Sequence, residues 1–309
     1  MYAIEANNLS KKYGEKVVVN NLNLRVREGS IFGFLGKNGA GKSTFINMIT
    51  GLISPTSGSF KLFGDSEYSN KDIYTKIGVL PDYSTFYEHL TALEHLKYFS
   101  KILGLSLTKD EMINILRLVE LEDSANLKAG KFSFGMKKRL GIAQALINNP
   151  RILFLDEPTS GVDANAALNI HSLIKNIAKQ GTTIFLTSHN LDEVEKLCDD
   201  IAIMDQGVIK IQGSMEELRN EYKNNITLYV KHSKVLEEQK KWLEKNLLSL
   251  AKSLKVGYTS TELILDSEET IATVNKLFLS KDINVYRLEV DEPSLEEIFI
   301  NINVGKHTA

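Results

Sequence analysis

Cysteine and long hydrophobic runs are what this 309-residue sequence has least of. Its single cysteine, Cys198, excludes an internal disulfide, and we expect this thiol to serve helix packing. The longest apolar runs, such as Ile152–Leu155, are strand-sized and fall far short of the roughly 20 residues that span a bilayer. The first residues, Met1–Glu5, lack the basic and apolar pattern of a signal peptide. We therefore expect a chain that is soluble by itself and reaches a membrane only through a partner.

An excess of positive charge is absent as well. The net charge is −2 at pH 7, so no overall basic field attracts nucleic acid, and we predict no nucleic-acid partner. Hydrophobic and charged contents of 43% and 25% are those of an ordinary globular protein. A length of 309 residues suits two domains, or one large and one small domain.

The most informative stretch that is present fits the pattern G-x-x-x-x-G-K-[S/T]. Such a loop wraps its backbone N–H groups around the phosphates of a nucleotide, because its glycines allow close approach and positive φ. It follows an apolar, strand-like segment and opens a helix-like one, which places the phosphates at a helix N-terminus. We expect Lys42 to reach the β- and γ-phosphates and Ser43 to bind Mg²⁺. The predicted nucleotide-binding residues here are Gly36, Lys37, Asn38, Gly39, Ala40, Gly41, Lys42, Ser43 and Thr44.

Strand-like and helix-like segments alternate through about residue 215, which predicts an α/β domain with a largely parallel sheet. Between about residues 88 and 147 the apolar residues recur at helical spacing instead, which indicates a helical insertion. We assign residues 1–220 to this first domain. Its expected strands include Ile31–Leu35, Ile152–Leu155, Thr183–Thr187 and Ile201–Met204.

The tail from about residue 225 has the order strand, helix, two strands, helix and strand, which is that of split βαβ, ferredoxin-like domains. We predict that residues 225–309 form a small α+β domain. A terminal helix should follow it, with Ser294 as N-cap and Glu297 three residues on. The expected elements of the domain are the strand Ile226–Lys231, the helix Val235–Leu250, the strands Leu254–Tyr258 and Glu262–Asp266, the helix Glu269–Leu279 and the strand Ile283–Val290.

Two carboxylates, Asp156 and Glu157, follow the buried strand expected at residues 152–155. Ligands of open α/β sheets bind beyond the carboxyl ends of the strands. Asp156 suits Mg²⁺, directly or through water, and Glu157 could orient or deprotonate the water that attacks a γ-phosphate. Without the glycine loop the pair would simply end a strand before Pro158; with it, the pair predicts a hydrolytic site.

Three further motifs occur in order: Phe132–Met136 at the start of a helix, Ser160–Asp163 after the acidic pair, and Leu186–His189 at a strand end. Together with the glycine loop and the acidic pair, they make residues 1–220 resemble the ATP-binding subunits of ABC transporters. The resemblance implies an α/β P-loop NTPase fold, in which a RecA-like parallel sheet carries an antiparallel subdomain and a helical subdomain at about residues 88–147. ATP and Mg²⁺ are the implied cofactors.

The resemblance also implies roles for single residues. Tyr13 would stack on the adenine, and Glu157, His189 and Lys42 would be catalytic, with His189 as the switch histidine. Taken alone, Tyr13 suits surface packing equally well, and a histidine at a strand end is more often a satisfied polar residue.

The family signature implies a second protomer. Ser133 and Gly135 would contact the γ-phosphate of an ATP that is held by the partner, so that ATP is sandwiched between two copies or between this chain and another ATPase. The following basic residues, Lys137, Lys138 and Arg139, suit a solvated helix face and stay outside the predicted site.

Two positions depart from the family pattern. Phe134 stands where the signature usually has glycine, and Asp82 stands where many relatives have glutamine. Asp82 can still bind Mg²⁺ or water, so it joins Ser43 and Asp156 as a predicted metal ligand, although it adds negative charge near the γ-phosphate. Both departures leave the turnover rate open.

The end of the chain, above all Pro293–Phe299, resembles that of exporter-type (ABC-2) ATPases that serve drugs, antimicrobial peptides or lipid-linked compounds. This implies a subunit that hydrolyses ATP at the cytoplasmic face of the cell membrane, bound to a membrane permease. Aromatic residues beside Asp82 could line the groove for that permease or simply pack the helical insertion: Tyr83, Phe86, Tyr87 and Tyr98.

Two other function classes compete with this one. A soluble ABC ATPase of DNA repair should separate Lys42 from Asp156 by a long coiled coil, and one of translation should carry two cassettes; neither feature is present. A regulatory or sensory ATPase with weak hydrolysis is kept open by the two departures, whereas Glu157 and His189 argue against it. The transported compound is not encoded in a recognisable motif.

Overall fold

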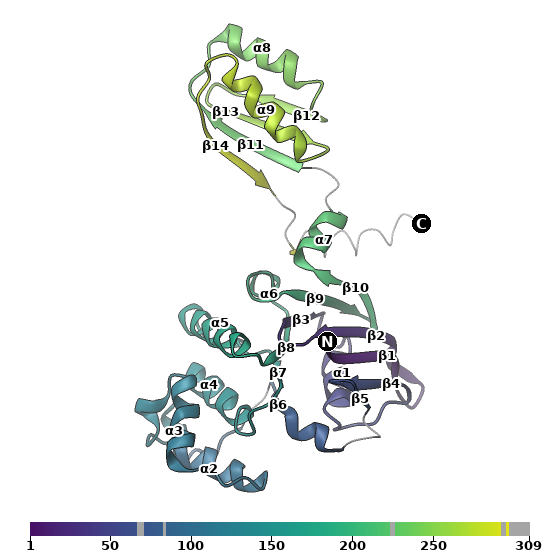
Figure 1. Cartoon of the computed structure of the whole chain (residues 1–309), viewed down its shortest axis with the longest axis vertical. Coiled ribbons are helices and arrows are strands. Elements are labelled where there is room, and N and C mark those ends of the chain that lie inside the picture. The colour runs from purple at the N-terminus through teal and green to yellow at the C-terminus, as the bar shows by residue number, and fades with distance from the viewer. Residues whose placement is uncertain (67–70, 83–84, 223–225, 292–294, 297–309) are drawn as a thin grey trace. The chain divides into compact units, whose positions relative to one another are not determined.

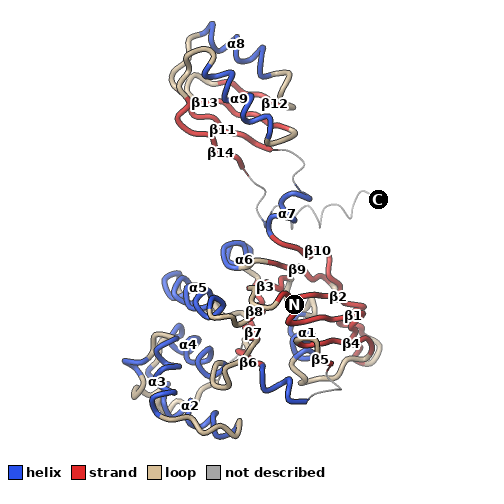
Figure 2. The backbone as a smooth tube through the Cα atoms, in the orientation of Figure 1, coloured by secondary structure: helices blue, strands red, loops and turns tan. Residues whose placement is uncertain are grey.

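The computed structural model describes residues 1–66, 71–82, 85–222, 226–291 and 295–296. The chain divides into two compact units, residues 1–215 and 216–309. Within the described residues the strands form three sheets, two in the first unit and one in the second (Figures 1 and 2). Tyr83 and the N-cap expected at Ser294 with Glu297 lie outside the described residues.

A six-stranded sheet forms the centre of the first unit, in the order β10–β9–β3–β8–β7–β6. Neighbouring strands are parallel except β10, which runs antiparallel to β9. Strands β3 and β8 are buried along their whole length, as is typical of parallel strands that are covered on both faces. The expected strands are thereby confirmed. Their bounds are β3 Ile31–Leu35, β6 Ile77–Leu80, β7 Ile152–Asp156, β8 Thr183–Ser188, β9 Asp200–Asp205 and β10 Val208–Ser214.

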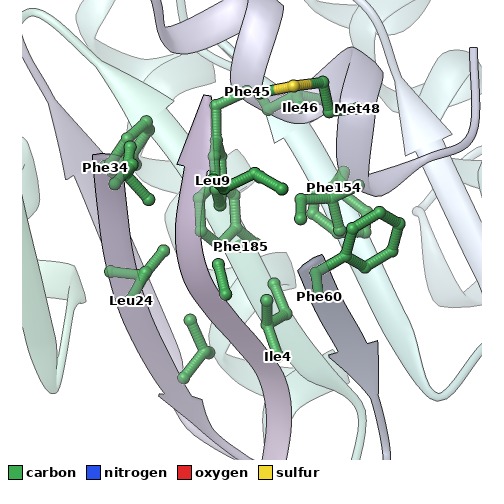
Figure 3. Close-up of a cluster of buried hydrophobic side chains, with 14 of the residues drawn as sticks. Ile4, Leu9, Leu24, Phe34, Phe45, Ile46, Met48, Phe60, Phe154 and Phe185 are labelled. Atoms are coloured by element: carbon green, nitrogen blue, oxygen red, sulfur yellow. The ribbon is translucent and has the colours of Figure 1, made fainter. Parts of the chain in front are cut away.

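The second sheet of this unit is antiparallel, in the order β2–β1–β4–β5. One hydrophobic cluster connects it to the parallel sheet through α1 (Lys42–Ile49). Figure 3 shows the rings at its centre, where Phe185 lies 5.3 Å from Phe154 and 5.4 Å from Phe34 between ring centroids. This shared core fixes α1, and therefore the glycine loop before it, relative to both sheets. The bounds are β1 Tyr2–Tyr13, β2 Lys16–Arg27, β4 Ser57–Leu62 and β5 Asp65–Ser66.

The helical insertion consists of α2 (Ala92–Ile102), α3 (Lys109–Leu118) and α4 (Phe134–Ala145), with α4 packed against β6. Helices α2 and α3 both begin with capping boxes, in which a threonine and a glutamate three residues later bond to each other's backbone N–H. Two more helices, α5 (Ala164–Lys179) and α6 (Leu191–Leu197), contact β8. The chain's cysteine lies buried just after α6, with its sulfur close to Gly33 of β3.

In the second unit, β11 (Ile226–His232) lies at the centre of an antiparallel sheet with the order β12–β13–β11–β14. Helices α8 and α9 bury their apolar residues against this sheet in a core of their own. The strand and helix order confirms the predicted split βαβ arrangement. Helix α7 (Met215–Tyr222) precedes the sheet. The remaining bounds are α8 Glu237–Leu247, β12 Ser253–Val256, β13 Ser260–Leu265, α9 Glu269–Leu279 and β14 Val285–Asp291.

Several of the predicted boundaries in the tail are too wide, including the helix end at Leu250, since α8 ends at Leu247. Val235 does not begin α8, because its N–H is bonded to the carbonyl of Tyr258 and holds it in a loop. Tyr258 in turn lies beyond the end of β12, in a turn that Gly257 N–H closes on the carbonyl of Ser260. Ile283 lies in the loop between α9 and β14, where its N–H bonds to the carbonyl of Phe278 in the last turn of α9.

Candidate functional site

The glycine loop connects the buried end of β3 to the first turn of α1, as predicted. Gly36 and Gly41 have φ of 153° and 113°, and a side chain would not fit at either position. A Cβ on Gly36 would lie 2.3 Å from the carbonyl oxygen of Met204, and one on Gly41 would lie 2.7 Å from that of Val18. Gly39, with a φ of 82°, faces open space. The loop is therefore a tight backbone cradle of the kind that binds phosphate.

Lys42 is buried inside this loop. Its ammonium donates to the carbonyl oxygen of Gly36 at 2.6 Å and lies 3.4 Å from that of Lys37. Burial lowers the pKa of Lys42, while the nearby carboxylates of Glu157 and Asp156 act in the opposite direction. The cation thus lies between the cradle and the acidic pair, where an anionic phosphate would complete its coordination.

Asp156 ends β7 and connects the glycine loop to the neighbouring strand. Its Oδ2 accepts from Ser43 Oγ at 3.5 Å, and its other oxygen accepts from the hydroxyl of Thr187 on β8. A serine hydroxyl and a carboxylate next to a phosphate cradle form the all-oxygen donor set that Mg²⁺ prefers. The residues present therefore fit a magnesium ion, with Ser43 and Asp156 as its protein ligands.

Glu157 has a backbone conformation that non-glycine residues rarely adopt, with a φ of 50°. Its N–H donates to Thr187 Oγ1 at 3.1 Å, and its Oε2 lies 2.8 Å from Nδ1 of His189. Because an ionised carboxylate can only accept, this contact requires the proton on Nδ1. The Glu157 side chain is 13% exposed and that of His189 is 65% exposed, so the pair faces outward from the sheet edge.

Lys138 corrects the expectation of a solvated basic helix face. Its side chain is only 6% exposed, and its ammonium donates to the carbonyl oxygens of Glu157 at 2.9 Å and Asp82 at 3.2 Å. Lys137 and Arg139 are partly exposed. Sequence reasoning missed Lys138 because it assigned all three consecutive basic residues to solvent. The available signal was the spacing, because Lys138 follows the apolar Phe134 by four residues and so lies on the same side of α4.

Glu193 is a second buried charge that the sequence did not single out. Its carboxylate accepts from Thr159 Oγ1 and His171 Nε2 at 2.6 Å each and from Ser188 Oγ at 2.9 Å. Burial raises the pKa of Glu193, but the three hydrogen bonds outweigh it and leave the pKa below its ordinary value. Asn190 caps α6 by accepting from the N–H of Glu193, which places Glu193 in the first turn of the helix. Acidic residues are common at that position, so the sequence does not indicate that Glu193 is buried.

Some predicted site residues are not joined to this centre. Tyr13 ends β1 and is half exposed, with the ammonium of Lys11 5.1 Å from its ring centroid. Ser133 caps α4, where Gly135 lies against α5. Among the described residues, no hydrogen bond or ion pair connects Ser133 or Gly135 to the glycine loop. Among the described residues, the Asp82 carboxylate lies 3.8 Å from the Lys138 ammonium and has no hydrogen bond to Ser43 or Asp156.

The fold and site together define a P-loop nucleotide-binding protein. A mainly parallel sheet carries a glycine loop at a helix N-terminus, and an acidic pair stands at the end of a nearby strand. The loop lysine and serine lie within reach of that pair, which is the arrangement that binds and hydrolyses a nucleoside triphosphate.

Comparison with known proteins specifies the family. The profile of the ABC transporter family matches residues 19–160, and that of the C-terminal domain of DrrA1-3-like ATP-binding proteins matches residues 213–302. The bacitracin transport ATP-binding protein BcrA of Bacillus licheniformis is 36% identical over 98% of this chain and 97% of its own. The linearmycin resistance ATP-binding protein LnrL of Bacillus subtilis is 34% identical over 97% of each chain.

Solved structures agree with these relatives. An ATP-binding subunit of an ABC transporter matches with a TM-score of 0.64 and 29% identity over 71% of this chain and 93% of its own. A dimeric ATP-binding cassette in a post-hydrolysis state, bound to ADP and Pi, matches with a TM-score of 0.61 and 27% identity over 69% and 98% of the two chains. The chain belongs to the ATP-binding subunits of ABC transporters. The predicted family, fold class and ATPase activity are thereby confirmed.

Proposed function

We propose that this chain energises an ABC exporter at the cytoplasmic face of the cell membrane, and that two ATPase protomers share each ATP. The relatives named for bacitracin transport and linearmycin resistance support the export of an antibiotic-like compound. Among the described residues, the helices are too short or too polar to span a bilayer. The observation that carries the proposal is that one chain holds the glycine loop, the acidic pair and His189 together, whereas its signature residues lie apart from them.

Phosphate binding is the role of the glycine loop. Its backbone N–H groups and the N-terminus of α1 surround the triphosphate, and Lys42 neutralises the β- and γ-phosphates. We expect the Lys42 ammonium, which donates to the Gly36 carbonyl oxygen at 2.6 Å, to donate to a phosphate oxygen when a nucleotide binds. Mg²⁺, held by Ser43 and Asp156, would supply charge neutralisation for the phosphate oxygens.

Water activation is the role of Glu157. Its carboxylate is held at 2.8 Å from His189, so an attacking water can lose its proton to Glu157 while His189 orients the carboxylate and faces the γ-phosphate. The proton moves from water to a carboxylate oxygen, the new P–O bond forms, and the bond to the leaving β-phosphate oxygen breaks. Tyr13 would provide an aromatic face for adenine.

A second protomer completes the site. The Ser133 oxygen accepts from Met136 N–H at 3.2 Å, so its hydroxyl hydrogen remains available for a phosphate oxygen. The N-terminus of α4 adds its dipole, which is worth up to about 2 kcal/mol for a partly buried anion. Both features are directed at an ATP that another chain holds, since the loop of the same chain is not in contact with them.

A cavity of about 620 Å³ between the sheet and the helical insertion provides a place for the permease. It is lined mainly by apolar residues of β6 and α2, including Val79, Phe99 and Ile102, and closed by Ala145 of α4. A short amphipathic segment of a permease fits such a lining. Tyr87 and Tyr98 do not line this cavity; their rings pack against each other with centroids 5.4 Å apart within the helical insertion.

Introducing a negative charge at the cavity tests this docking site. Ile102 is 62% exposed, so Ile102→Glu should leave the fold intact and abolish co-purification of a permease from membranes. Leu118→Glu changes an exposed leucine of α3 outside the cavity and serves as the matched control. Undiminished co-purification of the permease with Ile102→Glu would place the contact elsewhere.

The catalytic role is tested by Glu157→Gln. Loss of the general base should lower kcat by about 10²- to 10⁴-fold, while the ATP dissociation constant changes little. Asp192→Asn, an exposed carboxylate nearby in α6, is the control and should hydrolyse ATP normally. Unchanged turnover of Glu157→Gln would remove Glu157 from the catalytic role.

Sharing of ATP between protomers is tested by complementation. Lys42→Ala and Ser133→Arg protomers should each be inactive as homodimers. Mixed dimers contain one site with the intact loop of one chain and the intact signature of the other, so mixing should restore part of the ATPase activity. If each chain held a complete site, every site in the mixture would carry a lesion and no activity would return.

A further inference from the structure

We infer that Lys138 is a positioning residue for the proposed catalytic carboxylate: it holds the backbone of Glu157 to the signature helix α4 and to Asp82. The inference rests on the proposed role of Glu157. It assigns to Lys138 the task of making hydrolysis depend on the position of α4, the helix that the second protomer is expected to contact.

The geometry of Lys138 suits this task. An ammonium has three N–H donors, and two of them are used on the carbonyl oxygens of Glu157 and Asp82, at 2.9 and 3.2 Å. The third side of the ammonium faces the Asp82 carboxylate at 3.8 Å. A single side chain of α4 therefore joins the end of β6 to the end of β7. Burial lowers the pKa of Lys138, and the carboxylates of Asp82, Glu157 and Asp156 oppose that shift.

Glu157 is the residue whose conformation needs such support. Its φ of 50° lies in the left-handed region, which is disfavoured for a non-glycine residue, so surrounding contacts must hold it. The N–H is held by Thr187 of β8, and the carbonyl oxygen is held by Lys138. Without Lys138, one end of this residue would be free to relax, and the carboxylate would lose its fixed direction toward His189.

The same face of α4 contacts the loop after Glu157. Phe134, one turn before Lys138, lies over Gly161, where a Cβ would come within 3.0 Å of the Phe134 ring. The Lys138 ammonium lies 5.9 Å from the centroid of that ring. Phe134 and Lys138 thus connect α4 to the two ends of the segment 157–161. The departure from glycine at Phe134 has a structural use here, since its side chain covers the buried lysine.

Asp82 acquires a role in this arrangement as well. The charge of the buried Lys138 ammonium is compensated by nearby carboxylates, of which Asp82 is one, at 3.8 Å. The negative charge that departs from the usual glutamine is therefore matched inside the protein. This explains why Asp82 contacts Lys138 rather than the expected magnesium ligands.

The test compares Lys138→Met with Lys137→Met. Both remove one ammonium from adjacent positions of α4, but Lys137 is partly exposed, and its side chain has no hydrogen bond or ion pair with the residues that the structure describes. We expect Lys138→Met to lower kcat by about 10- to 100-fold, because a shift of about 1 Å in a reacting group costs that much, with the ATP dissociation constant within threefold of wild type. Lys137→Met should keep both values within twofold.

A second arm shows whether Lys138 acts through Glu157. In the Glu157→Gln background, single-turnover hydrolysis should fall less than a further twofold on adding Lys138→Met, because the group that it positions is already lost. An additional tenfold loss there would overturn the inference, and so would Lys138→Met with wild-type kcat. If Lys138→Met does not fold, Lys138→Gln takes its place with the same expected and overturning outcomes. An inactive wild-type chain would instead contradict the proposed function.

Discussion

Glu193→Ala is the substitution whose effect on stability follows most directly from the structure. The carboxylate of Glu193 is 4% exposed and accepts hydrogen bonds from Thr159, His171 and Ser188. Each bond to a charged acceptor contributes about 1.5–3 kcal/mol, but the bonds are not additive and water can enter the space that the side chain leaves. Removing the carboxylate leaves its buried donors without an acceptor, which costs about 1–3 kcal/mol for each, and we expect a total loss of about 3–5 kcal/mol.

Urea unfolding of the full chain, followed by far-ultraviolet circular dichroism, measures this loss. With a slope near 3 kcal/mol per molar urea, a loss of about 3 kcal/mol moves the midpoint of the first unit by about 1 M. Trp242, the chain's single tryptophan, packs in the core of the second unit, so its fluorescence follows that unit and should not shift. The control Asp192→Ala removes an exposed carboxylate of α6 and should change the stability by less than about 0.5 kcal/mol. A midpoint for Glu193→Ala within about 0.2 M of wild type would refute the reasoning.

Two further predictions concern glycines. Gly36→Ala should weaken ATP binding at least about tenfold, because its Cβ would lie 2.3 Å from the Met204 carbonyl oxygen. The Cβ of Gly39→Ala would meet no atom within 4 Å, so this variant should bind ATP more tightly than Gly36→Ala in equilibrium dialysis. The reverse order would contradict the cradle geometry. Gly78→Ala should destabilise the first unit by about 1–3 kcal/mol, since its Cβ would lie 2.1 Å from the carbonyl oxygen of Ala145. An unchanged midpoint in thermal unfolding would show that α4 and β6 can move apart with no loss of stability.

The order of the motifs in the sequence predicts that the glycine loop and the acidic pair lie close together, because a parallel sheet brings the ends of separate strands to one edge. Asp156 and Thr187 are paired across β7 and β8, so motifs at the ends of separate strands must meet at one edge. The apolar runs that form these strands are short, continuous and bounded, which is the clearest strand signal in a sequence. The glycine loop could be predicted from the local sequence alone, because its positive φ values follow from its glycine content.

Lys138 and Glu193 could not be found in the same way. Both are charged residues on helices, and single-sequence patterns assign such residues to solvent because most of them lie there. Their burial depends on which helix face meets the loop after β7, and this is set by packing between elements far apart in sequence. The tail boundaries failed for a related reason, since Val235 and Ile283 use their N–H groups in contacts that local propensity does not encode.

The pH dependence of the Glu193 contribution gives the last prediction. The pKa of Glu193 is lower in the folded chain than its ordinary value of 4.5, so the unfolded chain binds this proton more tightly. Its stabilisation is therefore complete above pH 4.5 and is lost as the pH falls through the lower, folded pKa. The difference in urea midpoint between wild type and Glu193→Gln should persist from pH 7 down to about pH 5 and shrink below pH 4.5. A wild-type midpoint that rises relative to that of Glu193→Gln as the pH falls from about 7 to 6 would mean that burial, not the three hydrogen bonds, governs this carboxylate, with a pKa raised instead of lowered.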